Sequence, residues 1–407
     1  MPRIVSIKNC ACEPPIFRGS MGGVLIEFSR QVQTIHLMKA VHHKAFHHLA
    51  AALVPADAVS NCAIMMHEMV QDLGYRSFLY APLRAGDYAK SARRLSDLES
   101  EIRSGDVVVY HHSTGSDAAE LFTGRSNVRR LLVYHNVTPP LLLDPNGEAF
   151  AANARGLAQL PSLVQSADLS IAFSEFSARD LRQAGGSSAI KVVALPLSDA
   201  WCDSLQLVAT KRDAQRRQND SAVRLLHVGR VVPSKRLEIA IRAAEWIARD
   251  GGNLPVSLTL VGDTNAAPEY VEQLVAYAGD HPSITLKVRG SLSRDALAEE
   301  FAAADIYICP SAHEGFCVPL VECMFAELPV IAAACGAIPE TLAGSGIVLP
   351  DACAEQFAEA ARRLLLDAAL REKLREKQRE VRGRYTMQSF KQGWVRIIAG
   401  LLEQETA

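Results

Sequence analysis

The sequence has neither a long apolar run nor an excess of basic charge. Its 407 residues include 43 Lys and Arg against 45 Asp and Glu, which gives a formal net charge of -2. Proteins that bind nucleic acid through overall charge are strongly basic, so this balance argues against a nucleic-acid partner. No apolar stretch approaches the roughly 20 residues of a membrane-spanning helix. The composition therefore favours a protein without membrane spans.

The chain also lacks the usual patterns of secretion and of structural zinc. Residues 1–8 have no apolar core and no small-residue cleavage site, which argues against a signal peptide. The nine cysteines are scattered, and no C-x-x-C pair has the spacing of a zinc site. These absences predict a reduced, cytoplasmic protein with no metal and no cofactor.

Histidines are concentrated near the amino terminus, at His36, His42, His43, His47 and His48. His43 and His47 are four residues apart and would share one face of a helix. A metal site is one interpretation of this stretch. No carboxylate stands at ligand spacing in the same run, so a surface cluster is the favoured interpretation.

What the sequence does contain is an alternation of strand-like and helix-like segments. In the C-terminal half, apolar runs at 223–228, 256–261, 284–288, 306–309 and 329–333 alternate with helical stretches at 235–250, 268–279, 293–303 and 319–327. This alternation predicts a doubly wound, parallel α/β sheet. The length and the 49% apolar content predict two such domains.

The N-terminal half repeats the pattern less regularly. A helix is predicted over 57–73 and another over 177–184, with strands at 76–80, 106–111, 130–135, 168–173 and 191–195. The polar, charged segment 210–220 predicts a linker or an exposed loop between the halves. The predicted domains are 1–200 and 201–384.

Ligands of such sheets bind beyond the carboxyl ends of the strands, where Gly229, Gly262, Gly290 and Gly315 fall. Arg230 and Lys235 follow the first of these glycines, with Ser234 as the expected N-cap of the next helix. An arginine fork and a lysine point charge beside a helix start suit a diphosphate. The alternative is a solvated basic loop.

Two carboxylates, Glu314 and Glu322, stand eight residues apart around a Gly-Phe step and a proline. Pro319 predicts a helix start, which places Glu314 on the loop and Glu322 about one turn inside the helix. Acids beside a helix N-terminus, where an anion binds well, suggest binding of sugar and ribose hydroxyls. The alternative is two ordinary acids favoured by the helix dipole.

The N-terminal half offers two polar strand ends. His111 and His112 precede a Ser-Thr-Gly loop, and a histidine there suits hydrogen bonding or proton transfer. The second strand end, Tyr134-His135-Asn136 with Pro139 and Pro140 behind it, predicts a stiff loop that lines a cleft.

Taken in order, these motifs resemble the retaining, GT-B-fold glycosyltransferases of family 4, also called group 1. The resemblance rests on Gly229-Arg230-x4-Lys235, Leu260-Val261-Gly262-Asp263, Arg289-Gly290 and the E-x7-E module from Pro310 to Glu322. It covers most of residues 223–350. It implies two Rossmann-like domains facing each other across a cleft, with residues 385–407 crossing back to complete the first.

The resemblance also implies roles for individual residues. The catalytic group is His111, Glu314, Arg230 and Lys235. The donor-binding group is Gly229, Arg230, Lys235, Gly262, Arg289, Leu292, Glu314, Gly315, Phe316, Cys317 and Glu322. The acceptor-binding group is Asp57, Ser60, Asn61, His112 and Asn136. Two departures stand out, because Ser60 and Cys317 occupy positions where the family often has glycine.

The implied activity is transfer of a sugar from a GDP- or UDP-linked donor, without a metal, in bacterial surface polysaccharide or glycoconjugate synthesis. The acceptor would be a saccharide, a lipid-linked molecule or a small molecule, and peripheral contact with the inner face of the membrane is compatible with this. Two alternatives keep the fold: a nucleotide-sugar 2-epimerase-like enzyme and a non-catalytic binding subunit.

Overall fold

A computed structural model of the protein describes residues 44–403, except residues 56, 186–188, 216–221 and 251–253. Within this part of the chain, two six-stranded sheets follow one another, and every strand pair in them is parallel. We call residues 44–192 the N-terminal lobe and residues 199–385 the C-terminal lobe. The prediction of two doubly wound α/β units is confirmed, whereas the predicted domain boundaries stay predictions.

The N-terminal lobe has the strand order β3-β1-β5-β6-β7-β8. Its strands are Ala45–Ala50 (β1), Arg76–Tyr80 (β3), Val107–His112 (β5), Arg129–Tyr134 (β6), Leu169–Ala172 (β7) and Ala189–Val192 (β8). A small separate pair is formed by Ala52–Leu53 (β2) and Leu83–Arg84 (β4). The helices are Ala58–Asp72 (α2), Tyr88–Ser91 (α3), Leu98–Glu101 (α4), Ala118–Thr123 (α5), Glu148–Ser166 (α6) and Glu175–Gln183 (α7).

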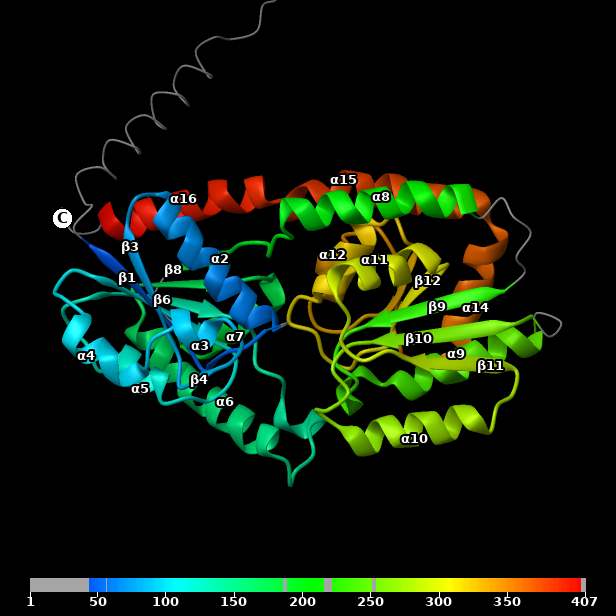
Figure 1. The fold of residues 1–407 in the computed structure, drawn as a ribbon, viewed down its shortest axis with the longest axis horizontal. Helices are drawn as coiled ribbons and strands as arrows, with labels where there is room; N and C mark the ends of the chain where they lie inside the picture. The colour runs from blue at the N-terminus through cyan, green and yellow to red at the C-terminus, as the bar shows by residue number, and fades with distance from the viewer. Residues whose placement is uncertain (1–43, 56, 186–188, 216–221, 251–253, 404–407) are drawn as a thin grey trace, which may run out of the picture. The chain divides into compact units, whose positions relative to one another are not determined.

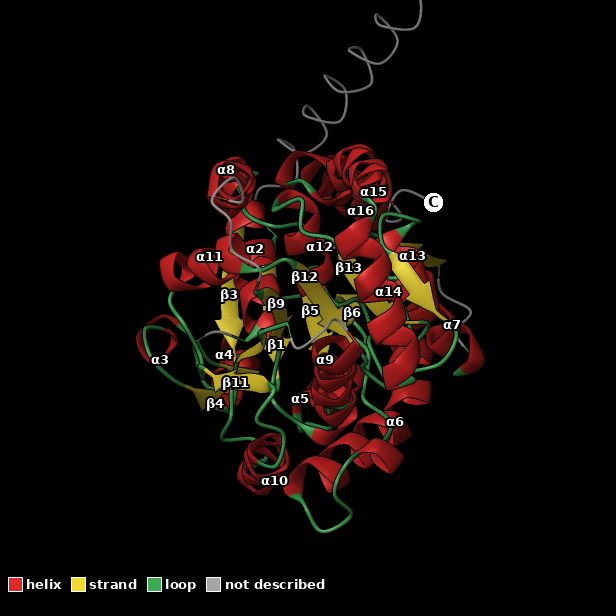
Figure 2. Ribbon diagram, turned by 90° about the vertical axis from the view of Figure 1, so that its right-hand side faces the viewer, coloured by secondary structure: helices red, strands yellow, loops and turns green. Residues whose placement is uncertain are grey.

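The C-terminal lobe has the strand order β11-β10-β9-β12-β13-β14. Its strands are Val223–Val228 (β9), Val256–Val261 (β10), Ile284–Val288 (β11), Ile306–Cys309 (β12), Val330–Ala333 (β13) and Ile347–Leu349 (β14). Its helices are Asp199–Gln215 (α8), Leu237–Asp250 (α9), Pro268–Gly279 (α10), Arg294–Ala303 (α11), Val318–Phe325 (α12), Ile338–Leu342 (α13), Ala354–Leu366 (α14) and Ala368–Val381 (α15). Figure 2 shows the strands enclosed between helices.

Each sheet has one place where the chain reverses the direction in which it adds strands. In the N-terminal lobe this place is the β1–β5 pair, and in the C-terminal lobe it is the β9–β12 pair. Loops that leave these two strand pairs diverge and leave room for a ligand. The predicted catalytic residues lie at these points, because Arg230 and Lys235 follow β9, Glu314 follows β12 and His111 lies near the end of β5.

Local sequence explains where the helices beside these points begin and end. Asp57 caps α2 by accepting a hydrogen bond from Ser60 N, and the helix gives way to Gly74 at φ 89°. Such a conformation is strained for any residue with a side chain. Pro319 stands in the first turn of α12, as predicted. The predicted starts and stops of these two helices are therefore confirmed.

The last helix, Met387–Glu403 (α16), returns to the N-terminal lobe (Figure 1). A methyl group added at Gly393 would lie 3.7 Å from Val193 Cγ1, which immediately follows β8. The buried stripe of α16 contains Phe390, Trp394, Ile398 and Leu401, at the spacing of one helical face. Helix α16 thus lies beside the end of β8, while completion of the N-terminal domain by residues 385–407 stays a prediction.

Two predictions from charge and histidine content are wrong. Residues 210–215 of the segment predicted as a linker or exposed loop are the end of α8, whose buried stripe contains Trp201, Leu205 and Val208. Residues 216–220 of that segment lie outside the described residues. The guanidinium of Arg212 donates to the carbonyl oxygens of Ala326 and Glu327 at 2.7 Å each. A buried cation at the end of α12 satisfies carbonyls that the helix leaves free.

The favoured interpretation of the histidines as a surface cluster is the second wrong prediction, because His47 and His48 lie buried in strand β1. His36, His42 and His43 lie outside the described residues. Every side chain of β1 is buried, since helices cover both faces of the sheet. None of the helices in the described residues is both long and apolar enough to cross a membrane.

Candidate active site

The C-terminal lobe brings two glycine loops together at the ends of β9 and β10. Gly229 has φ 154° and Gly262 has φ 142°. A Cβ at Gly262 would lie 2.1 Å from the carbonyl oxygen of Gly229, so no larger residue fits there. The backbones of the two loops are therefore in direct contact. Backbone groups and the side chain of Lys235 line the space next to the loops.

Lys235 and Glu314 form a buried ion pair beyond these strand ends. The distance between Lys235 Nζ and Glu314 Oε1 is 2.6 Å, and their side chains are 16% and 11% exposed. Lys235 ends a single 3-10 turn, Pro233–Lys235, and the left-handed Arg236 then leads into α9. The expected N-cap role of Ser234 is wrong, because Ser234 lies inside this turn and its carbonyl accepts a hydrogen bond from Ala312 N.

The electrostatics of the pair keep both groups charged. Burial disfavours the carboxylate of Glu314, but the charge of Lys235 and the hydrogen bonds from Lys235 and Ser311 outweigh this and hold its pKa below the ordinary value. Burial likewise disfavours the ammonium group, yet the charge of Glu314 raises the pKa of Lys235 above its ordinary value. The result is a fixed positive and a fixed negative charge at one strand end.

The loop between β12 and α12 is held in an unusual conformation. Cys317, at the N-cap of α12, has φ 70° and ψ 73°, a left-handed conformation that glycine adopts more readily. Cys317 is buried. The donor-binding role of Cys317, Gly315 and Phe316 stays a prediction.

Glu322 lies inside α12 and is only 9% exposed. Its Oε1 accepts a hydrogen bond of 2.9 Å from the indole N–H of Trp201, on α8. Burial raises the pKa of Glu322, and the Trp201 hydrogen bond opposes that shift. Glu322 and Glu314 therefore occupy different surroundings, one beside an indole and the other beside an ammonium group.

The other residues predicted to bind the donor are more exposed than Lys235 and Glu314 or lie at the edge of the core. Arg230 is exposed just after Gly229. Arg289 Nε lies 3.2 Å from Glu300 Oε1 and is about half exposed, so it is already paired. Leu292 packs at the edge of the C-terminal core. None of these placements tests a binding role, and those roles stay predictions.

His227 was not among the predicted site residues, although it precedes Gly229 by two positions. Its ring is buried, and its Nδ1–H donates to the carbonyl oxygen of Ile308 at 2.9 Å. Nε2 therefore carries no proton, and it lies 3.3 Å from the position of a Cβ at Gly229. Burial lowers the pKa of His227 to about 4, with the Ile308 carbonyl opposing and the Lys235 charge adding to that shift.

In the N-terminal lobe, the two adjacent histidines of β5 point to opposite faces of the sheet because side chains alternate along a strand. His112 Nε2–H donates to the carbonyl oxygen of Gly156 in α6 at 3.0 Å. His111 lies on the other face, 3.1 Å from His48 and 3.1 Å from His135 by ring nitrogens. Both rings are 0% exposed.

His111 and His112 end strand β5, in agreement with the strand end predicted there. Neighbours in the same lobe contact their ring nitrogens, so neither ring is free for a ligand by itself. His135 follows β6 and is only partly buried. It is therefore the half-exposed member of the row formed by His48, His111 and His135.

The predicted acceptor residues near α2 lie at the start of that helix, where Asp57 and Ser60 stabilise its first turn. Asp57 Oδ2 accepts hydrogen bonds from Ser60 N and Ser60 Oγ at 2.8 and 2.7 Å. Ser60 is fully buried, whereas Asn61 is exposed. Ser60 thus stabilises a helix turn, and an acceptor-binding role for these three residues stays a prediction.

Asn136 connects the N-terminal lobe to the donor loop. Its Oδ1 lies 2.6 Å from His313 Nε2, and its Nδ2 donates to Asp180 Oδ2 at 3.0 Å. The hydroxyl of Ser174 donates to the carbonyl oxygen of Gly315 at 2.7 Å. These contacts place the β6–α6 loop and the start of α7 against the loop that carries Glu314.

The start of α7 is further held by Glu340 of the C-terminal lobe. Its carboxylate accepts hydrogen bonds from the backbone N–H groups of Glu175 at 2.7 and 2.9 Å and of Phe176 at 3.2 Å. A carboxylate at a helix N-terminus satisfies free N–H groups and interacts well with the helix dipole. Motif reading missed Glu340 because it lies outside the E-x7-E module.

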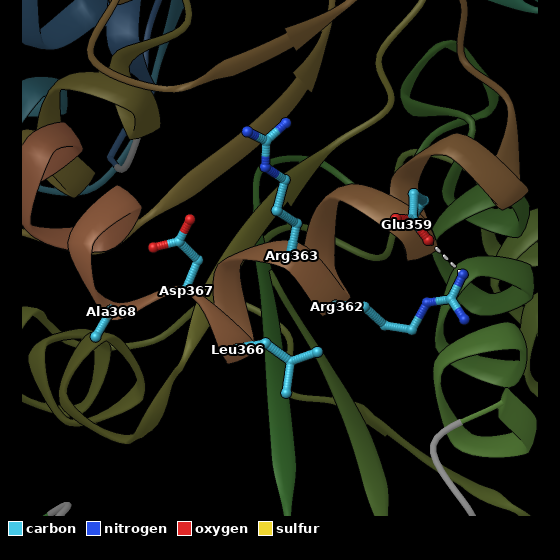
Figure 3. Close-up of a pocket in the computed structure, with 6 residues that line it drawn as sticks. All are labelled: Glu359, Arg362, Arg363, Leu366, Asp367 and Ala368. Carbon is cyan, nitrogen blue, oxygen red and sulfur yellow. Dashed lines mark hydrogen bonds and ion pairs between the residues drawn. The ribbon is translucent and has the colours of Figure 1, made fainter.

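A hollow on the surface of α14 and α15 is unrelated to these residues. It is lined by Glu359, Arg362, Arg363, Leu366, Asp367 and Ala368 (Figure 3). Arg362 is paired with Glu359, and Leu366 is 87% exposed. Its charges are mixed and open to solvent, so it offers no organised site.

Comparison with solved structures identifies the fold. Sucrose-phosphate synthase from Thermosynechococcus elongatus matches with a TM-score of 0.68 at 18% identity, over 89% of this chain and 100% of that chain. HepE of Anabaena, solved in complex with UDP and glucose, matches with a TM-score of 0.66 at 17% identity, over 87% of this chain and 99% of that one. These identities are low and show the fold alone, which is GT-B.

Sequence comparison finds a family match in the C-terminal lobe. Residues 222–367 match the family described as glycosyl transferases group 1. The alpha-D-kanosaminyltransferase of Streptomyces kanamyceticus is 28% identical over 37% of this chain and 39% of that protein. A D-inositol 3-phosphate glycosyltransferase of Kineococcus radiotolerans is 27% identical over 51% of this chain and 52% of that protein. The chain thus spans about half or less of the length of these relatives.

Proposed function

We propose that this protein transfers a sugar from a nucleoside diphosphate sugar to an acceptor, with retention of the anomeric configuration. The observation that carries the proposal is the buried pair of Lys235 and Glu314 at the β9–β12 reversal point. Relatives in sequence are named glycosyltransferases, and a relative in fold is a complex with UDP-glucose. Both findings support the same reaction class.

In this proposal the C-terminal lobe holds the donor. Lys235 and the exposed Arg230 bind the diphosphate and stabilise the charge that grows on it as the sugar leaves. Glu322 accepts hydrogen bonds from the ribose hydroxyls, and Glu314 orients the sugar. Cationic side chains supply the charge that a metal ion supplies in other transferases, so the diphosphate needs no metal.

The N-terminal lobe holds the acceptor and closes over the donor sugar. Contacts of Asn136 with His313 and of Ser174 with Gly315 bring that lobe to the donor loop. Exclusion of water by such closure would limit hydrolysis of the donor. His111 lies behind His135 in the histidine row, so in this proposal His135 is nearer to the sugar than His111 is.

Donor binding is tested first, by thermal shift of the full chain with UDP, GDP and their sugar conjugates. A hit is followed by NMR of the product, in which retention means that donor and product share one anomeric configuration. Formation of an epimer from the donor alone would assign the chain to the 2-epimerase-like alternative. Failure of every nucleoside diphosphate to bind would favour a non-catalytic subunit.

The proposed location is the cytoplasm, with peripheral membrane contact when the acceptor is lipid-linked. Helix α15 is rich in basic residues that could meet anionic lipid, and some of them are paired, as Arg379 is with Glu327 and Glu372 at 2.6 Å each. Sedimentation with anionic vesicles tests the contact. An acceptor in bacterial surface polysaccharide or glycoconjugate synthesis is part of the same proposal.

A further inference from the structure

A thiol and two imidazoles from three different elements converge inside the N-terminal lobe. Cys62 comes from α2, His111 from β5, and His135 follows β6. One ligand atom of each, the sulfur and one nitrogen per ring, lies within 4.8 Å of the other two. Cys62 is 3% exposed and His111 is 0% exposed, while His135 reaches the surface in part. These are the residue types that bind zinc.

The spacing is close to that of a tetrahedral ion. Zinc–nitrogen bonds of about 2.0–2.1 Å and zinc–sulfur bonds of about 2.3 Å put two tetrahedral nitrogens about 3.3 Å apart and a nitrogen about 3.5 Å from a sulfur. His111 Nδ1 and His135 Nε2 are 3.1 Å apart. A modest rotation of the Cys62 thiol, which now contacts Met66 Sδ at 3.9 Å, would complete the set.

The surroundings of His111 match those of a metal ligand. A ligating imidazole usually has its second nitrogen held by a hydrogen bond, which fixes its tautomer and orientation. His111 Nε2 is held in this way by His48 Nδ1 at 3.1 Å. His48 is 1% exposed, and among the described residues its Nε2 has no hydrogen-bond partner. A buried nitrogen without a hydrogen-bond partner lowers stability, so its presence indicates that the site serves a function.

We propose that Cys62, His111 and His135 bind a thiophilic d10 cation, Zn²⁺, with His48 as the positioning residue behind His111. Three protein ligands leave a fourth position for water on the half-exposed side of His135. The ion connects α2, β5 and β6, so it stabilises the lobe that contributes Asn136 and Ser174 to the donor loop. It is separate from the diphosphate, which the proposed function leaves to Lys235 and Arg230.

A second trio, Cys309, Glu314 and Cys317, also places its ligand atoms within 4.8 Å of one another. There the ammonium group of Lys235 already lies 2.6 Å from Glu314 Oε1. A divalent cation would have to displace that charge or be repelled by it. The N-terminal trio has no such cation in its hydrogen bonds, which is why it is the one proposed.

The test uses the full chain, freed of metal by dialysis against a chelator and then loaded with Zn²⁺ or Co²⁺. We expect one ion per chain, a cobalt–thiolate charge-transfer band, and a rise in melting temperature of about 5 °C at zinc concentrations well above Kd. Cys62→Ser abolishes the band, and the half-exposed His135→Gln lowers affinity without unfolding the chain. His48→Gln keeps one ion per chain but weakens binding about 10–100-fold.

Cys317→Ser is the matched control, because it removes a thiol from the competing trio and leaves the proposed site intact. The cobalt–thiolate band of this variant and its number of bound ions per chain should equal those of the unmodified chain. Loss of the band in Cys317→Ser with retention in Cys62→Ser would overturn the proposal, as would absence of bound zinc in a folded chain. Circular dichroism of each variant establishes that it is folded.

Discussion

The ammonium group of Lys235 lies 2.6 Å from a carboxylate oxygen of Glu314, and both side chains are largely buried at one strand end. Neither residue is free for a ligand by itself. In the proposed function, an arriving diphosphate would meet a lysine already oriented by a carboxylate, and a sugar hydroxyl would meet a carboxylate kept ionised by a lysine. The pair is therefore organised before the donor binds, which lowers the ordering cost of binding.

The first prediction concerns this pair. Lys235→Met should reduce product formation by at least about 100-fold, because the charge that stabilises the leaving diphosphate is lost. It should also lower the free energy of unfolding by about 3–5 kcal/mol, since Glu314 is left buried and unpaired. Urea unfolding and a product assay measure the two effects.

The double variant Lys235→Met/Glu314→Gln separates these effects. Without an unpaired buried charge its stability should recover most of the loss, while its activity should stay low. Recovery of activity together with stability would show that the pair is structural and would remove the main support for the proposed donor site.

The second prediction concerns Glu322 and Trp201. Glu322→Gln should weaken binding of a nucleoside diphosphate about tenfold, equivalent to about 1.4 kcal/mol, because a charged acceptor of the ribose hydroxyls becomes neutral. The same variant should bind a 2′,3′-dideoxy nucleotide as the unmodified chain does. Calorimetry with the two nucleotides checks both statements, and equal weakening for both would remove the ribose assignment.

Trp201→Phe tests the role of Glu322 through the pH dependence of nucleotide binding. The indole N–H opposes the burial that raises the pKa of Glu322, so its removal should raise that pKa further. A group whose folded pKa is raised is neutral over a wider range at low pH, so nucleotide binding should be lost at a higher pH than in the unmodified chain. Arg294 lies over the Trp201 ring, and phenylalanine retains that contact surface.

The third prediction is acid destabilisation of the C-terminal lobe by His227. Its folded pKa is lowered to about 4, so the unfolded chain binds more protons between this value and about 6.5. The contribution of neutral His227 to the free energy of unfolding is complete above the pKa of the unfolded chain, and it is lost as the pH falls toward 4. The loss amounts to about 3 kcal/mol at most, from 1.36 kcal/mol per pKa unit.

His227→Phe provides the control for this effect. The ring of His227 stacks on Tyr307, and phenylalanine preserves that stacking while removing the titrating group. Unfolding of this variant should show a weaker dependence on pH between about 4 and 6.5. An unchanged slope would assign the acid sensitivity to other groups.

The fourth prediction concerns closure of the two lobes over the donor. A Cβ at Gly315 would lie 2.5 Å from Asn136 Cβ, so Gly315→Ala should separate the donor loop from the N-terminal lobe. We expect kcat to fall about tenfold or more while binding of the nucleoside diphosphate is unchanged, since in the proposed function the diphosphate contacts only the C-terminal lobe. Gly279→Ala is the matched control, because no heavy atom lies within 4 Å of its Cβ position.

Sequence reasoning recovered the C-terminal lobe well. The runs at 223–228, 256–261 and 284–288 are β9, β10 and β11 with the same bounds. Apolar runs followed by glycine are strong evidence for parallel strands, and β9 and β10 are mostly buried, whereas the edge strand β11 is partly exposed. It failed at α8, where charge in the last turn concealed the apolar stripe containing Trp201, Leu205 and Val208. It also failed at β1, whose histidines do not look like a buried strand.

The sequence by itself determined the alternation of strands and helices, the glycines at the strand ends and the two acids of the E-x7-E module, because these depend on residues close together in the chain. Only the tertiary structure decided the partner of each polar group. Glu314 meets Lys235 across 79 residues, Glu322 meets Trp201 across 121, and His48 meets His111 across 63. Such pairings depend on which strands become neighbours at the reversal points and on which face each side chain takes, and local spacing contains neither.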